Sequence, residues 1–121
     1  MQRDPRLVPL SREHHAALRL GRQLMAGGAR AALRAQLGAL AAHFAQEELT
    51  LLPLLGAHGE HDLARRLREE HTRLSALFAA VLRGEHEIEA GQALIDHVRF
   101  EERELFPVIE TLFDGVEAAL P

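Results

Sequence analysis

The sequence of 121 residues predicts an all-α fold, an antiparallel up-down-up-down four-helix bundle. Three observations support this prediction. Ala, Leu, Arg and Glu, which favour helix, dominate the chain, and no stretch alternates apolar and polar residues as a strand does. Apolar residues recur at helical spacing in four successive runs. Short connections that contain glycine separate these runs, which favours antiparallel packing of neighbouring helices.

The chain divides into a lead-in at residues 1–10 and a helical domain at residues 11–121. Pro5 and Pro9 disfavour helix, so the lead-in is expected to be extended. Ser11 stands directly before a run with helical periodicity and is therefore the expected N-cap of the first helix. The glycine pair at 27–28 is expected to end that helix.

Three further helices are expected along the chain. The second helix runs from about residue 29 to 55, and Pro53 should kink it or end it. The third covers about 60–82 and is followed by Gly84, and the fourth covers about 87–113. These four segments account for most of the chain and leave only short loops.

Composition excludes several classes of site. The chain contains no cysteine, which rules out disulfides, thiolate zinc sites and iron–sulfur clusters. A net charge of −4 argues against a nucleic-acid partner. No stretch approaches the roughly 18–20 apolar residues that span a membrane, and the N-terminus does not resemble a signal peptide. We therefore expect a cytoplasmic protein with no membrane partner.

One motif occurs twice, in the second and fourth helices. It reads HFAQEELTLLPLL from His43 and HVRFEERELFPVI from His97. In each copy a Glu follows the His by four residues, giving the pairs His43–Glu47 and His97–Glu101. Because residues i and i+4 share one face of a helix, each copy directs an imidazole and a carboxylate towards the same point.

A lone His in each of the other two helices completes the pattern. His14 lies in the first helix and His71 in the third, and each is directly preceded by a Glu. The chain therefore reads as two similar helical hairpins, each with two His and one Glu. Periodicity favours His14 over its neighbour His15, because His14 lies four residues before Leu18 on the apolar face.

Six residues are therefore candidate metal ligands: His14, His43, Glu47, His71, His97 and Glu101. Burying imidazoles and carboxylates among leucines costs free energy, which a bound metal ion would offset. Four imidazoles and two carboxylates suit first-row transition metals, iron and manganese especially, and zinc is also compatible. The residues alone leave open whether one metal ion binds or two ions share the two Glu.

Other charged residues near the motifs have less defined roles. Glu13 and Glu70 either orient a ligating His or are simply exposed, and both readings remain open. The following residues fall off the apolar faces or in loops and are expected at the surface: Glu48, Arg99, Glu102, Arg103, His58, His61 and His86.

With these motifs the chain resembles the hemerythrin-like family, also called the HHE cation-binding domain, over about residues 11–113. The resemblance implies a four-helix bundle around a non-haem centre of two iron ions. It implies that Glu47 and Glu101 bridge the two ions and that His43 and His97 are terminal ligands, and the family's His of the first and third helices correspond to His14 and His71.

The sequence departs from the oxygen-carrying members of that family at two positions. Those members have a second His four residues after the His of the third helix, where this chain has Ser75. They also have an Asp five residues after the His of the fourth helix, where this chain has Glu101 four residues after His97. The chain thus resembles a variant with four His and two Glu. An open metal position near Ser75 then favours sensing, peroxide handling or iron binding over reversible oxygen carriage.

Three functions follow from these observations. The leading hypothesis is a non-haem di-iron protein that binds dioxygen, nitric oxide or peroxide, or handles iron itself. The alternative is a di-iron enzyme, peroxidase- or catalase-like, that acts on peroxide or another small oxidant. The third is a bundle whose metal only stabilises the fold. The sequence identifies no protein partner for any of these functions.

Overall fold

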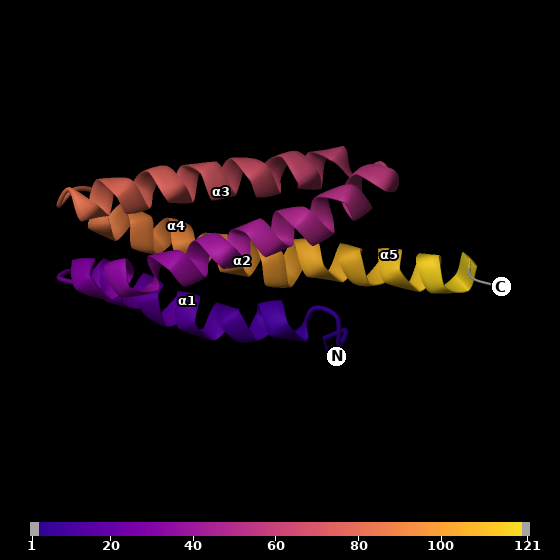
Figure 1. The fold of residues 1–121 in the computed structure, drawn as a ribbon, viewed down its shortest axis with the longest axis horizontal. Coiled ribbons are helices and arrows are strands. Elements are labelled where there is room, and N and C mark those ends of the chain that lie inside the picture. Colours follow the sequence, from indigo (N-terminus) through magenta and orange to yellow (C-terminus); the bar gives the residue numbers. More distant parts are fainter. Residues whose placement is uncertain (1–2, 120–121) are drawn as a thin grey trace.

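A computed structural model describes residues 3–119, which form helices joined by short turns (Figure 1). Successive helices run in opposite directions, and the last three elements follow one another without a loop. The predicted all-α antiparallel four-helix bundle is therefore confirmed. The elements are α1 (Val8–Ala26), α2 (Arg30–Ala57), α3 (His61–Leu82), α4 (Glu87–Phe100), the π-helical turn η1 (Glu101–Leu105) and α5 (Phe106–Ala119).

Helix α1 begins earlier than the sequence suggested. Its N-cap is Leu7, so the expected N-cap at Ser11 is wrong, and residues 8–10 of the expected lead-in are helical. Pro9 lies in the first turn of the helix, where its fixed φ is suitable and its missing N–H is not needed. Ser11 instead donates its hydroxyl hydrogen to Glu102, in η1.

The two prolines of the repeated motif have different surroundings. Helix α2 continues through Pro53 to Ala57, so this proline does not end the helix. Pro107 is the second residue of α5, which follows directly after η1, a π-helical turn that helical periodicity did not predict. In this turn the Phe106 N–H donates to the Glu101 carbonyl, five residues earlier. A π-turn inserts one extra residue into a helix and often occurs at functional sites.

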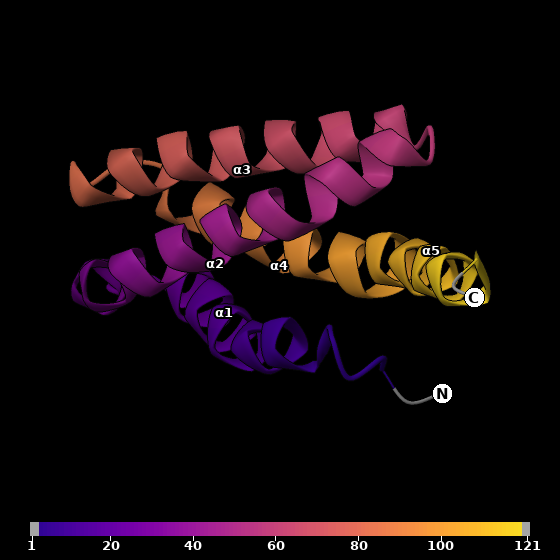
Figure 2. The ribbon, with the colours of Figure 1, turned by 45° about the vertical axis from the view of Figure 1, so that its right-hand side comes forward.

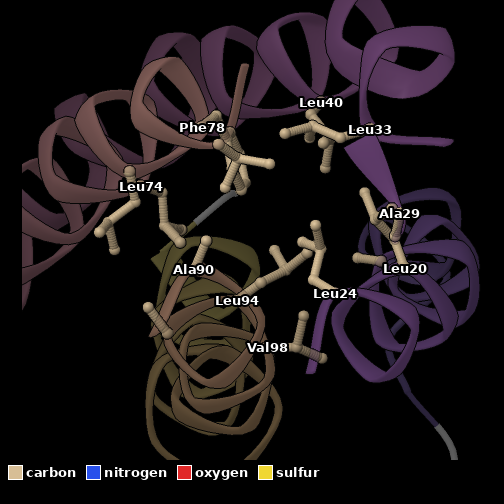
Figure 3. Packing of buried hydrophobic residues seen from close by; sticks show 14 of the residues in the cluster. Leu20, Leu24, Ala29, Leu33, Leu40, Leu74, Phe78, Ala90, Leu94 and Val98 are labelled. Atoms are coloured by element: carbon tan, nitrogen blue, oxygen red, sulfur yellow. The ribbon is translucent and has the colours of Figure 1, made fainter. Parts of the chain in front are cut away.

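Two apolar clusters fill the bundle, and they lie on either side of the predicted ligand positions along each helix. One contains Leu20, Leu33, Phe78 and Leu94 (Figure 3). The other includes residues from both ends of the chain, such as Leu7, Leu55, Leu67 and Phe106. Within the described part of the chain, no helix has the length and apolarity needed to cross a membrane.

The helices approach one another most closely where α1 meets α4. A Cβ atom placed on Gly91 would lie 2.5 Å from the Gly21 carbonyl oxygen and 2.9 Å from the Met25 backbone nitrogen. Only glycine permits this backbone contact. Helix α2 crosses the bundle obliquely, beginning beside α1 and ending beside α3 (Figure 2). These contacts hold the four helix faces that carry the predicted ligands around one centre.

Candidate metal centre

The six predicted ligand residues meet in the middle of the bundle. The side chains of Glu47 and Glu101 are completely buried, and the four His residues are between 3% and 7% exposed. His15, the alternative to His14 in the first helix, is exposed. We call Glu47 and Glu101 the inner carboxylates.

The six residues form two overlapping groups. His14 and His43 form the first group with the two inner carboxylates, and His71 and His97 form the second with the same carboxylates. Within each group one candidate ligand atom from each residue lies within 4.8 Å of the others. Each group could hold a metal ion, and the shared carboxylates could contact both ions.

Every imidazole directs its Nε2 atom towards an inner carboxylate. The Nε2 atoms of His14 and His97 lie 2.9 and 3.2 Å from Oε1 of Glu101. The Nε2 atoms of His43 and His71 lie 3.2 and 3.0 Å from oxygens of Glu47. Each of the four helices therefore directs one imidazole Nε2 atom to the common centre.

Three buried polar atoms at this centre have no hydrogen-bond partner in the described structure: Oε2 of Glu47, Oε2 of Glu101 and Nε2 of His97. The short distance from His97 to Glu101 does not have the geometry of a hydrogen bond. Buried carboxylate oxygens without donors are costly and therefore uncommon. A metal ion at this centre would provide these three unpartnered atoms with a partner, so the residues present suit such a group.

The opposite nitrogen of each imidazole, Nδ1, contacts a second carboxylate, which we call an outer carboxylate. The outer carboxylates are Glu13, Glu48, Glu70 and Glu102, and their distances to Nδ1 of His43, His71, His97 and His14 are 2.9, 2.8, 2.7 and 2.6 Å. An ionised carboxylate only accepts hydrogen bonds, so Nδ1 carries the hydrogen. The Nε2 lone pair of a neutral imidazole is then free for a metal ion.

These contacts follow a cyclic order around the bundle. An outer carboxylate of α1 contacts the His of α2, one of α2 contacts that of α3, and one of α3 contacts that of α4. Glu102, in η1, closes the cycle at His14 of α1. Such bonds fix the tautomer and the orientation of a ligating imidazole and raise its basicity.

Glu48 and Glu102, which were expected at the surface, lie at the edge of the site. They are partly exposed, yet each contacts a predicted ligand on another helix. For Glu13 and Glu70, the structure supports orientation of a His rather than simple exposure. The Glu doublet in both copies of the motif could have indicated this role, because only one Glu of each doublet can face the centre and the other lies beside it.

The buried charges shift the pKa values of the centre. Burial lowers the pKa of His43, but the nearby Glu101 and Glu47 carboxylates outweigh this effect and raise it to about 11. The same balance, with Glu101 and Glu70 as the main neighbours, raises the pKa of His97 to about 9. Protons on imidazoles therefore supply positive charge to the centre of the metal-free protein, and a metal ion would have to displace them.

The two inner carboxylates differ in their pKa values. Burial and the neighbouring Glu101 raise the pKa of Glu47. Burial alone would also raise the pKa of Glu101. However, contacts with Glu47 and with the imidazoles of His14, His43 and His97 hold it well below its usual value. Glu101 is therefore the main negative charge at the centre of the metal-free protein.

Aromatic rings support two of the imidazoles. Phe44 stacks on His71 with a centroid distance of 4.3 Å, and Phe106 stacks on His14 at 5.5 Å. Ser75, the position of the missing family His, is exposed and borders an open hollow beside Phe44 and His71. The rings restrict how the imidazoles can turn.

A cavity of about 110 Å³ between α1 and α2 reaches the centre. Its lining includes His14, His43, His97 and Glu101, but neither His71 nor Ser75. The rest of its wall is mostly apolar and includes Ala17, Leu40, Phe44, Leu94 and Val98. Exposed Ala16 and Ala39 also border it. A small molecule entering here would meet the group of His14 and His43 first.

Comparison with known proteins agrees with this geometry. A family model described as the hemerythrin HHE cation-binding domain matches residues 7–109. No curated protein and no solved structure shows a significant match. The matched segment covers most of the chain and contains all six inward-facing His and Glu residues.

Proposed function

The chain belongs to the hemerythrin HHE cation-binding domain family. From this premise we propose that it is a non-haem di-iron protein that binds a small ligand such as dioxygen, nitric oxide or peroxide. The observation that carries the proposal is the sharing of Glu47 and Glu101 between two pairs of His. Each of these carboxylates has a buried oxygen without a donor.

Iron is the metal that this donor set suits in this family. Four imidazole nitrogens and two carboxylates, with no thiolate available in the chain, match iron and manganese better than softer metals. The two carboxylates would bridge the ions, and each ion would have two imidazoles. Two ferrous ions would supply electrons and an open coordination position to a small ligand.

The chain's own residues would control access and orientation. The cavity between α1 and α2 has a mostly apolar wall, which favours small uncharged molecules over ions. It leads to His14 and His43, so we assign the ligand-binding position to the metal ion that this pair would hold. The outer carboxylates would keep the imidazoles in place while the ligand enters and leaves.

Metal analysis of the purified protein tests the metal assignment. After expression with added iron we expect two iron ions per chain and a visible spectrum that disappears when a chelator removes the iron. Glu101→Ala should lose both ions, because Glu101 belongs to both groups. Glu104→Ala is the matched control, because Glu104 is an exposed residue of the same turn. Equal iron content in wild type and Glu101→Ala would contradict the assignment.

Mixing the reduced protein with ligands then separates the candidate functions. We expect nitric oxide and dioxygen each to change the visible spectrum with saturation. A dioxygen signal that is reversed under vacuum would indicate carriage, whereas immediate oxidation would favour sensing. Steady consumption of hydrogen peroxide would instead support an enzyme. Iron that responds to none of these ligands would leave only a structural role for the metal and refute the proposal.

A further inference from the structure

The segment before α1 packs against η1 and α5, beside the metal centre. Residues 3–7, which we call the N-terminal strap, contact α5 at Glu110. Arg3 Nη1 donates to Oε1 of Glu110 at 2.7 Å, and the Asp4 backbone N–H donates to Oε2 at 2.6 Å. Leu7 is 1% exposed and belongs to the same apolar cluster as Phe106. The strap is therefore held at a defined position next to η1.

Arg3 also contacts a carbonyl group that the helix leaves without a donor. The Phe106 N–H, four residues after Glu102, donates to the Glu101 carbonyl. The next residue, Pro107, has no N–H. The Glu102 carbonyl thus lacks its usual helical partner, and Arg3 Nη2 donates to it at 3.0 Å. An unpaired backbone carbonyl is costly when shielded from water, so this contact stabilises the π-turn.

The same guanidinium reaches His14 through the side chain of Glu102. Arg3 Nη2 lies 3.3 Å from Glu102 Oε1, and Glu102 Oε2 accepts from Ser11 at 2.8 Å and from His14 Nδ1 at 2.6 Å. Arg3 also lies over the Phe106 ring, which stacks on the His14 imidazole. Two routes therefore connect Arg3 to the orientation of one imidazole.

Arginine contacts support some of the outer carboxylates but not all of them. In residues 3–119, arginines contact two of the outer carboxylates, since Arg3 contacts Glu102 and Arg66 contacts Glu70. Arg3 serves His14, in the group whose two imidazoles both line the cavity, and Arg66 serves His97, in the other group. A change at Arg3 should therefore affect one metal position more than the other.

We propose that Arg3 is a positioning residue for the metal ion held by His14 and His43. It fixes Glu102 and the π-turn η1, and through them the imidazole of His14. The N-terminal strap is thus part of the metal centre's support, although Arg3 lies outside the matched family segment, which begins at residue 7. This inference rests on the proposed function, because it requires that a metal ion binds to these residues.

Anaerobic competition between a chelator and the ferrous protein tests the inference. In Arg3→Gln we expect one of the two iron ions to be bound about tenfold more weakly, with the other unchanged, because loss of such support commonly weakens metal binding by this order. Arg6→Gln is the matched control. Arg6 lies in the same strap, where it forms an ion pair with Asp4 and stacks on the Phe113 ring of α5. Arg3→Lys, which keeps the charge, should restore part of the affinity.

Two results would overturn the inference. One is an Arg3→Gln protein that binds both iron ions as wild type does. The other is an equal loss of iron affinity in Arg3→Gln and Arg6→Gln, which would mean that only the packing of the strap matters.

Nitrogen-15 NMR of the metal-free protein gives a readout independent of iron. There, Arg3→Gln should speed exchange of the His14 Nδ1 hydrogen. Wild type that binds no iron would overturn the proposed function, and the NMR result would still decide whether Arg3 holds His14.

Discussion

His71 donates its Nδ1 hydrogen to Glu48 across 2.8 Å, although helical periodicity places Glu48 off the inner face of α2. The two residues belong to different helices, and the contact joins α2 to α3. Three similar contacts join the other neighbouring helices around the bundle. The candidate metal centre thus has an inner set of candidate ligands and an outer set of carboxylates that contact their imidazoles.

Removal of Glu48 should weaken metal binding without unfolding the protein. In Glu48→Ala, His71 loses the acceptor that fixes its tautomer, and we expect affinity for the metal ion held by His71 and His97 to fall about 10- to 100-fold. Chelator competition measures the change. Glu69→Ala is the control, because Glu69 is exposed on α3. Unchanged affinity in Glu48→Ala would show that the Nδ1 contact does not support the site.

The metal-free protein should lose stability as pH rises above neutrality. The pKa of His97 is raised to about 9 and that of His43 to about 11, whereas an unfolded His titrates near about 6.5. The folded state therefore binds these protons more tightly. The resulting stabilisation is fully present below about pH 6.5 and is lost as pH rises through about 9 and then about 11.

Urea unfolding of chelator-treated protein at several pH values measures this effect. The free energy of unfolding should fall between pH 7 and 9 in wild type. His15→Gln should show the same decline, because His15 is exposed, and His97→Gln should show a smaller one. Metal-loaded protein should not show the decline, because its imidazoles are already deprotonated. A free energy of unfolding that is constant from pH 7 to 10 in the metal-free protein would refute the prediction.

A bulky residue at the cavity mouth should slow ligand entry. Ala39 is exposed and borders the cavity between α1 and α2. Ala39→Phe should lower the rate constant for nitric oxide binding to the reduced protein while leaving the iron content unchanged, which stopped-flow absorbance can follow. Ala42→Phe is the control, because Ala42 is exposed on the same helix but does not line the cavity. Equal rates in both variants would point to another route.

The contact between α1 and α4 should not tolerate a methyl group. In Gly91→Ala the new Cβ would lie 2.5 Å from the Gly21 carbonyl oxygen, and backbone atoms cannot move as easily as a side chain end. We expect a loss of about 1–3 kcal/mol in the free energy of unfolding. Gly38→Ala should instead gain up to about 1 kcal/mol, because nothing lies within 4 Å and alanine favours helix. Urea unfolding measures both, and equal effects would exclude the close contact.

Helical periodicity was sufficient to predict the bundle and the inner residues. The spacing of His43 and Glu47, repeated at His97 and Glu101, concerns residues on one face of one helix, where geometry follows from sequence distance alone. The choice of His14 over His15 depended on the same periodicity, and the structure buries His14. Which residues share a face of a helix does not depend on how that helix packs against its neighbours.

Features at the helix ends were predicted less well. The early start of α1 at Val8 and the π-turn at residues 101–105 depend on contacts with distant parts of the chain. Leu7 is buried in a cluster with Phe106 and Ile109, from near the other end of the chain, and Arg3 donates to the carbonyl that the π-turn leaves free. Sequence distance carries no information about these partners.

The sequence by itself determined that four amphipathic helices bury two matched sets of His and Glu, because helical repeat fixes which residues of a segment share a face. Only the tertiary structure decided that Glu48 and Glu102 hold imidazoles on neighbouring helices. It also decided that the cavity opens towards His14 and His43. The physical reason is that contacts between helices depend on how each helix is rotated and how it crosses its neighbours, which packing of the whole bundle sets.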